Sequence, residues 1–176
     1  RKPQRPNYSL ENFGEPFQIE CENLMSGILQ FEGGTIGNIL FDSNSIFILP
    51  EKPSLVLFGT LGILFMADAN QFGGEVKVIL KGNNEPFIIQ QSHAFTDECR
   101  GLGVADMAWA MRTGRKNRAS KEMAYHALDV LHGIVRSSET KSNQVIQSTF
   151  EKTPPIPRGY SGQTYFEFIE EFGIAQ

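Results

Sequence analysis

Residues 55–67 read Leu-Val-Leu-Phe-Gly-Thr-Leu-Gly-Ile-Leu-Phe-Met-Ala, and this stretch decides the fold of the chain. Its two halves, 55–59 and 62–67, are rich in branched and aromatic residues, which is typical of β-strands. Only Thr60 and Leu61 lie between them. Because a parallel pair of strands needs a crossover of about a dozen residues or more, so short a link predicts an antiparallel hairpin.

Both faces of this hairpin are predicted to be apolar, whereas a half-solvated strand has one polar face. Residue parity places four large apolar residues on each side: Leu55, Leu57, Ile63 and Phe65 on one, and Val56, Phe58, Leu64 and Met66 on the other. Helices can cover one of these faces. The second face is covered either by another copy of the chain or by the rest of the same monomer, and the sequence leaves both alternatives open.

The first half of the chain continues this pattern. Further strands are predicted at residues 18–21, 24–32, 35–42, 45–49, 75–80 and 86–91, separated by Gly, Pro, Asn and Asp. Their connections are short, such as Gly33-Gly34 and residues 81–85. Short connections join antiparallel neighbours, so the first half is predicted to be a largely antiparallel meander.

The second half changes to the period of a helix. One apolar stripe recurs at i, i+3, i+4 and i+7, and it consists of Val104, Met107, Ala108 and Met111. This first helix is predicted to end at Thr113-Gly114, where Gly supplies the left-handed position. Ser120 is predicted to cap a longer helix, with Glu122 in its first turn.

The longer helix is predicted to end at Ser137-Ser138. Its buried face is predicted to consist of Met123, Ala127, Leu128, Leu131, Ile134 and Val135. A short strand at residues 145–149, a proline-rich break at 153–157 and a small helix at 165–172 follow. The predicted fold class is α+β: a large, mostly antiparallel, open-faced sheet with helices packed on one face.

Length and composition fit a globular domain. The chain has 176 residues, of which 40% are hydrophobic and 20% are charged, and a domain of this length needs no disulfide or metal to fold. The formal net charge of −4 argues against a nucleic-acid partner, because phosphate binding needs clustered cations. Two separate cysteines suit a reducing cytoplasm, and no apolar run approaches the ~20 residues that span a bilayer. We therefore expect a cytoplasmic protein with no membrane partner.

Two motifs typical of dehydrogenases are incomplete or misplaced here. Gly101-Leu-Gly103-Val-Ala-Asp106 begins like a dinucleotide fingerprint, but the charge of Asp106 would oppose a pyrophosphate, and no βαβ unit surrounds it. We expect instead a glycine-rich turn that lets a helix pack closely on the sheet. Glu51-Lys52-Pro53 lies between Pro50 and a strand, which predicts an exposed turn.

Charged residues provide the remaining candidates for a site. One basic cluster lies at the junction of the two helices and forms either a solvated turn or an anion site; it consists of Arg112, Arg115, Lys116 and Arg118. Arg100 stands at the entry to the first helix, near His93, Asp97 and Glu98. Such a group is either a set of substrate contacts or a surface salt-bridge network.

His126 shares one helix face with Glu122 and Asp129. A zinc site takes more nitrogen or sulfur ligands than this face offers, so structural hydrogen bonding is the favoured interpretation of His126.

The run from Arg100 to Ser120 has the pattern R-G-x-G-x-x-D-M-A-x-A-x-x-x-G-R-x-x-R-A-S. A-x-H-x-L-x-V follows at residues 124–130, and the run continues to Ser148-Thr149. This pattern resembles the C-terminal domain of the Gfo/Idh/MocA oxidoreductases. Residues 58–62 resemble the G-T-x-G turn of the family and residues 68–74 its following loop. The similarity covers residues 15 to 157, and residues 158–176 depart from it.

The resemblance implies a parent enzyme with an N-terminal Rossmann domain that binds NAD or NADP. It implies hydride transfer to or from a sugar, inositol or related polyol, and a homo-oligomer formed through the open sheet face. We expect residues 1–157 to be the C-terminal domain and residues 158–176 a tail with a short helix. Because the chain opens at Arg1 without Met, the Rossmann domain is expected upstream.

The cofactor glycines and catalytic residues of the family lie upstream of the sheet, so no catalytic, cofactor-binding or metal-binding residue is expected in this chain. Arg100, Asp106 and His93 are the candidate substrate contacts. The alternative is a stand-alone binding or scaffolding module with the same fold and no catalysis.

Overall fold

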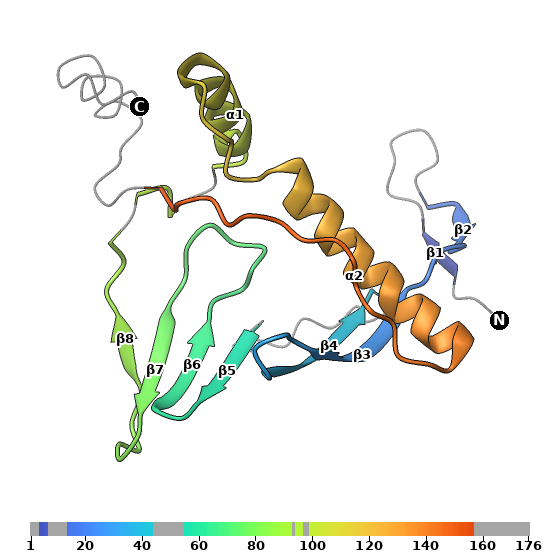
Figure 1. Ribbon diagram of the computed structural model, residues 1–176, viewed down its shortest axis with the longest axis horizontal. Helices are drawn as coiled ribbons and strands as arrows, with labels where there is room; N and C mark the ends of the chain where they lie inside the picture. The colour runs from blue at the N-terminus through green and yellow to red at the C-terminus, as the bar shows by residue number, and fades with distance from the viewer. Residues whose placement is uncertain (1–3, 7–13, 44–54, 93, 97–98, 157–176) are drawn as a thin grey trace. The chain divides into compact units, whose positions relative to one another are not determined.

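The computed structural model describes residues 4–6, 14–43, 55–92, 94–96 and 99–156. These residues form an α+β fold of open antiparallel sheets and two helices, as the sequence predicts (Figure 1). The chain divides into two compact units. Unit 1 comprises Arg1–Ile48 and Tyr125–Thr149, and unit 2 comprises Leu49–Ala124 and Phe150–Gln176.

Unit 1 contains two antiparallel hairpins. Strand β1 (Gln4–Pro6) pairs with β2 (Pro16–Gln18), and β3 (Leu24–Gln30) pairs with β4 (Ile36–Asp42) along its whole length. The turn after β3 is closed by two backbone hydrogen bonds of 2.9 Å between Phe31 and its neighbours Gly34 and Thr35. Gly34 has a φ of 85° in this turn, a backbone conformation that residues with a side chain rarely adopt.

Helix α2 (Lys121–Thr140) packs against the β3–β4 hairpin in unit 1. Gly27 of β3 makes the close approach possible, because a Cβ at this position would lie 3.3 Å from the side chain of Ile134. On the opposite face of the hairpin, polar residues alternate with four exposed aliphatic residues: Leu24, Ile28, Ile36 and Leu40. The sequence thus builds one face of the hairpin for a helix and leaves the other uncovered within the described part of unit 1.

Unit 2 contains a four-stranded sheet in which strands adjacent in sequence are adjacent in space (Figure 1). Its strands are β5 (Leu55–Gly59), β6 (Gly62–Met66), β7 (Val76–Leu80) and β8 (Phe87–Ile89), and every pair is antiparallel. The predicted antiparallel meander is therefore confirmed over residues 55–89, whereas residues 24–42 form a separate two-stranded sheet. The strand predicted at residues 18–21 was misplaced, because β2 ends at Gln18. The predicted strand at residues 45–49 lies outside the described residues.

The register corrects the predicted composition of the two faces of this sheet. Leu57 pairs with Leu64, and Phe58 pairs with Ile63, so odd residues of β5 share a face with even residues of β6. Odd-numbered residues therefore lie on opposite faces in the two strands, and the assignment of side chains to faces by parity alone was wrong. Both faces are nevertheless apolar.

We name the two faces by one member each. The Leu57 face holds Leu55, Leu57, Leu64, Met66, Val76, Val78, Leu80, Phe87 and Ile89. The Phe58 face holds Val56, Phe58, Ile63, Phe65, Lys77, Ile79 and Ile88.

Both predicted helices form, and the predicted end of the first and the predicted cap at the start of the second are confirmed. Helix α1 (Leu102–Thr113) ends at Gly114, which has a left-handed φ of 70°. The Ser120 hydroxyl caps α2 by accepting a hydrogen bond of 3.1 Å from the amide of Met123. The predicted end of α2 at Ser137-Ser138 was wrong, because the helix continues to Thr140.

The segment at residues 145–149 is not a strand, so that prediction was wrong as well. It lies along α2 instead. A Cβ at Gly133 would approach the terminal carbon of Ile146 to 2.5 Å, which shows that the side chain of Ile146 lies over this glycine. The predicted helix at residues 165–172 lies outside the described residues.

The apolar stripe of α1 does not face a core within the described part of unit 2. Val104, Met107 and Met111 are exposed, whereas Ala110 is buried and Asp106 is half-buried. The buried side of α1 is therefore rotated away from the predicted stripe. In α2 the second half of the predicted buried face, from residue 131 onward, is half-buried, while Met123, Ala127 and Leu128 are exposed.

Neither of the described helices combines the length and the apolar character that crossing a lipid bilayer requires.

Candidate functional site

The carboxylate of Asp106 organises the junction between α1 and α2. Its Oδ1 accepts a hydrogen bond of 2.7 Å from Nη2 of Arg115 and another from Nη1 of Arg118. Its Oδ2 accepts a hydrogen bond of 2.8 Å from the backbone amide of Arg118. We call Asp106, Arg115 and Arg118 the junction cluster. It ties the linker at residues 114–120 back to α1.

The junction cluster is largely buried, which makes its ion pairs stronger than surface pairs. The Asp106 side chain is 11% exposed, and those of Arg115 and Arg118 are about a quarter exposed. Burial raises the pKa of Asp106, but the hydrogen bonds from Arg115 and Arg118 outweigh it, so this pKa lies below the ordinary value of an aspartate. Asp106 is therefore ionised at neutral pH and balances part of the charge of the two arginines.

The linker is also tied to residues 150–156, which we call the strap. The Thr153 hydroxyl donates a hydrogen bond of 3.0 Å to the carbonyl oxygen of Arg118. Lys116 and Glu151 form an ion pair of 2.6 Å, and both side chains are more than 70% exposed. The pKa of Lys116 is raised and that of Glu151 is lowered by their mutual hydrogen bond. An exposed pair of this kind contributes little to stability.

The contacts of the four cations distinguish between the two interpretations of the basic cluster, a solvated turn and an anion site. Arg115 and Arg118 bind Asp106, and Lys116 binds Glu151. The guanidinium of Arg112 lies over the ring of Trp109, 5.2 Å from its centroid. All four cations thus have partners within the chain, which favours a helix-ending turn over an anion site.

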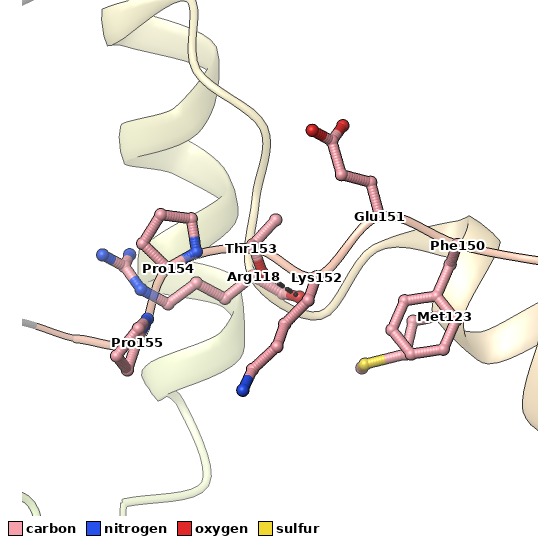
Figure 2. Close-up of a pocket in the computed structure, with 8 residues that line it drawn as sticks. All are labelled: Arg118, Met123, Phe150, Glu151, Lys152, Thr153, Pro154 and Pro155. Atoms are coloured by element: carbon pink, nitrogen blue, oxygen red, sulfur yellow. Dashed lines mark hydrogen bonds between the residues drawn. The ribbon is translucent and has the colours of Figure 1, made fainter. Parts of the chain in front are cut away.

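A pocket of about 300 Å³ lies between the strap and the start of α2 (Figure 2). Figure 2 shows Arg118 beside Pro154 and Pro155, and Phe150 beside Met123 on the other side of Lys152. The lining is mostly carbon, so this pocket suits an apolar group more than a polyol.

A second pocket, of about 650 Å³, surrounds the N-terminus of α2 and is more polar. Lys116, Asn117, Glu122, Glu151 and Thr153 contribute to it. Several of its polar groups already bind one another: the Asn117 amide donates to the carbonyl oxygen of Ala119, and Lys116 forms an ion pair with Glu151. The charges on its wall are mixed, which suits a neutral hydroxylated ligand better than an anion.

A separate polar cluster joins α2 to the segment at residues 145–149 within unit 1. Nδ1 of His126 lies 2.9 Å from the carbonyl oxygen of Ser148 and 3.0 Å from its hydroxyl oxygen. The Ser148 hydroxyl donates to Oδ2 of Asp129 at 2.8 Å, and Arg136 donates to Oδ1 at 3.1 Å. These bonds, first that of Ser148 and then that of Arg136, lower the pKa of Asp129.

This second cluster agrees with the structural interpretation of His126. Among the described residues there is no group of three or more His, Cys, Asp or Glu side chains placed to hold a metal ion. Glu122, which was predicted to share a helix face with His126, instead has its Oε1 3.8 Å from Nζ of Lys121.

The three residues predicted to contact the substrate lie in different surroundings or outside the described part of the chain. Asp106 binds Arg115 and Arg118. Arg100 is exposed at the turn that precedes α1. His93 lies outside the described residues, as do Asp97 and Glu98. The role of these residues in binding a substrate stays a prediction.

The two glycines after Arg100 do not bring α1 close to the sheet, so that expectation was wrong. A Cβ at Gly101 or Gly103 would meet no atom of the described residues within 4 Å. Sequence reasoning also missed Thr153 and Ser148, whose hydroxyls hold the linker and α2. The sequence indicates no bonding partner for either hydroxyl, since each partner lies at least 19 residues away in the chain.

The fold and these clusters define an α+β protein with open antiparallel sheets and a charged, internally paired helix junction. No family model, curated protein or solved structure matches the chain.

Proposed function

We propose that the chain is the substrate-side and oligomerisation domain of an NAD(P)-dependent oxidoreductase acting on a sugar, inositol or related polyol. The chain is inactive alone, because its parent enzyme binds NAD or NADP through a Rossmann domain upstream. The parent enzyme is a cytoplasmic homo-oligomer. The pattern from Arg100 to Val130 supports the enzyme class by resemblance. The observation that supports the oligomer most directly is the apolar character of both faces of the four-stranded sheet.

The Leu57 face is the more uniformly apolar of the two. All nine of its side chains in the strands are apolar, and six of them are 38–51% exposed: Leu55, Leu57, Met66, Leu80, Phe87 and Ile89. The Phe58 face includes one charged residue, Lys77, and Phe58 itself is 80% exposed. A water-facing sheet would place polar residues on one of these sides. Both faces therefore favour a covering partner.

The free energy available from covering the Leu57 face is large enough to support a dimer. Full burial of a large apolar side chain contributes about 1.5–3 kcal/mol, and the six exposed side chains are each roughly half uncovered. Completing their burial would contribute about 4–8 kcal/mol per copy. Two copies together would thus offset an association cost on the order of 4–15 kcal/mol.

The junction cluster supports a substrate-side role by fixing the loops around the polar pocket. Asp106 acts in this proposal by positioning Arg115, Arg118 and the linker, since its carboxylate oxygens already have donors. Arg100 and His93 are the proposed direct substrate contacts. The polyol itself would meet mixed donors and acceptors, which match the hydroxyl groups of a sugar.

Cofactor binding is tested by titrating the 176-residue chain with NADH and NADPH and following the nucleotide fluorescence. We expect no saturable change. Saturable binding by this chain would overturn the assignment of the cofactor site to an upstream domain. A nucleotide-binding Rossmann protein of known activity serves as the positive control.

The oligomer is tested by light scattering on the wild-type chain and on one charge variant of each sheet face, Leu57→Asp and Phe58→Asp. The wild type is expected to be at least a dimer. Leu57→Asp, on the face proposed as the subunit contact, is expected to give a folded monomer by circular dichroism, and Phe58→Asp is expected to leave the oligomer intact. Thr60→Asp, in the exposed turn between β5 and β6, should change neither property. A wild-type chain that stays monomeric at high concentration contradicts the proposal.

The second candidate function is a stand-alone binding or scaffolding module with this fold and no catalysis. The same apolar faces favour it, since they suit protein partners as well as a second copy. The two candidates are separated by reading about 150 codons upstream of Arg1, the size of one domain. A G-x-G-x-x-G after a strand, together with Glu-Lys-Pro, supports the enzyme, and a start codon without them supports the module.

A further inference from the structure

We draw no further inference here: the strongest candidate, the Leu57 face of the four-stranded sheet, belongs to the surface on which the proposed function already rests, and nothing in the described part of the chain shows what covers it.

Discussion

Replacing Asp106 by Asn tests whether the junction cluster holds the linker at residues 114–120 against α1. Asn keeps the size of the side chain but removes the charge, and it turns one acceptor into a donor that faces an N–H group. Three hydrogen bonds converge on the carboxylate, two from guanidinium groups and one from the amide of Arg118. The variant therefore leaves two partly buried cations without their counterion.

The cost follows from the burial of the cluster. Removing one member of a fully buried ion pair costs about 3–5 kcal/mol, and a hydrogen bond to a charged group contributes about 1.5–3 kcal/mol. Since Arg115 and Arg118 are about a quarter exposed, water can solvate part of their charge. We expect Asp106→Asn to lower the free energy of unfolding by about 2–4 kcal/mol, which for a chain of this size lowers Tm by roughly 4–16 °C.

The assay is urea unfolding and thermal melting followed by circular dichroism, with Glu151→Gln as the matched control. Glu151 forms an ion pair with Lys116 that is as short as that of Asp106 with Arg115, but both members of the Glu151 pair are exposed to solvent. Because exposed ion pairs contribute little, Glu151→Gln should melt within experimental error of the wild type. Equal costs for the two substitutions, or an unchanged melting curve for Asp106→Asn, would refute the role of Asp106 in holding the linker.

The effect of Asp106→Asn should also depend on pH in one direction. The pKa of Asp106 is lower in the folded protein than in the unfolded chain, where an aspartate titrates near pH ~3.9. The stabilisation by the carboxylate is thus fully present above about pH 5 and is lost as the pH falls through the folded pKa. The wild type and the variant should converge in stability in this acidic range. A difference between them that grows on acidification would contradict the assignment.

Three further substitutions test other parts of the fold. Gly62→Ala should destabilise the chain by about 3 kcal/mol or more, because the new Cβ would lie 2.2 Å from a carbonyl oxygen of β7. Gly59→Ala in the same hairpin would make only ordinary contacts, so equal melting curves for the two variants would disprove the register. Ser120→Ala should lower the free energy of unfolding in urea by about 1 kcal/mol, because it removes the cap of α2. Ser120→Asp should keep the wild-type stability, and a loss of stability in this variant too would count against the cap. Ser148→Ala should raise the pKa of Asp129 towards its ordinary value in an NMR titration, and an unchanged pKa would exclude the Ser148 hydroxyl as its main cause.

The elements that sequence reasoning placed well are those with strong local signals. The hairpin at residues 55–66 was predicted because a two-residue link permits only antiparallel pairing. Helix α1 ends at Gly114 as predicted because glycine adopts the left-handed conformation at low cost. The segment at residues 145–149 has the composition of a strand, but it packs against α2, where Ile146 lies over Gly133. No described strand pairs with this segment, so composition alone gave the wrong element.

The candidate site was harder to predict than the fold. Asp106 was singled out for its place in a motif, but its partners, Arg115 and Arg118, lie nine and twelve residues further along the chain. They reach Asp106 because the linker reverses direction after Gly114. The sequence gives the charges on both sides of that turn but does not give the path between them.

By itself the sequence determined the antiparallel order of the strands, the end of α1 and the cap of α2, because short loops, glycine conformation and hydroxyl caps act between near neighbours. Only the tertiary structure decided which side chains share a sheet face, which side of α1 is buried and which cations bind Asp106. Those features depend on register and on the course of the linker, where a shift of one residue turns a side chain to the opposite face.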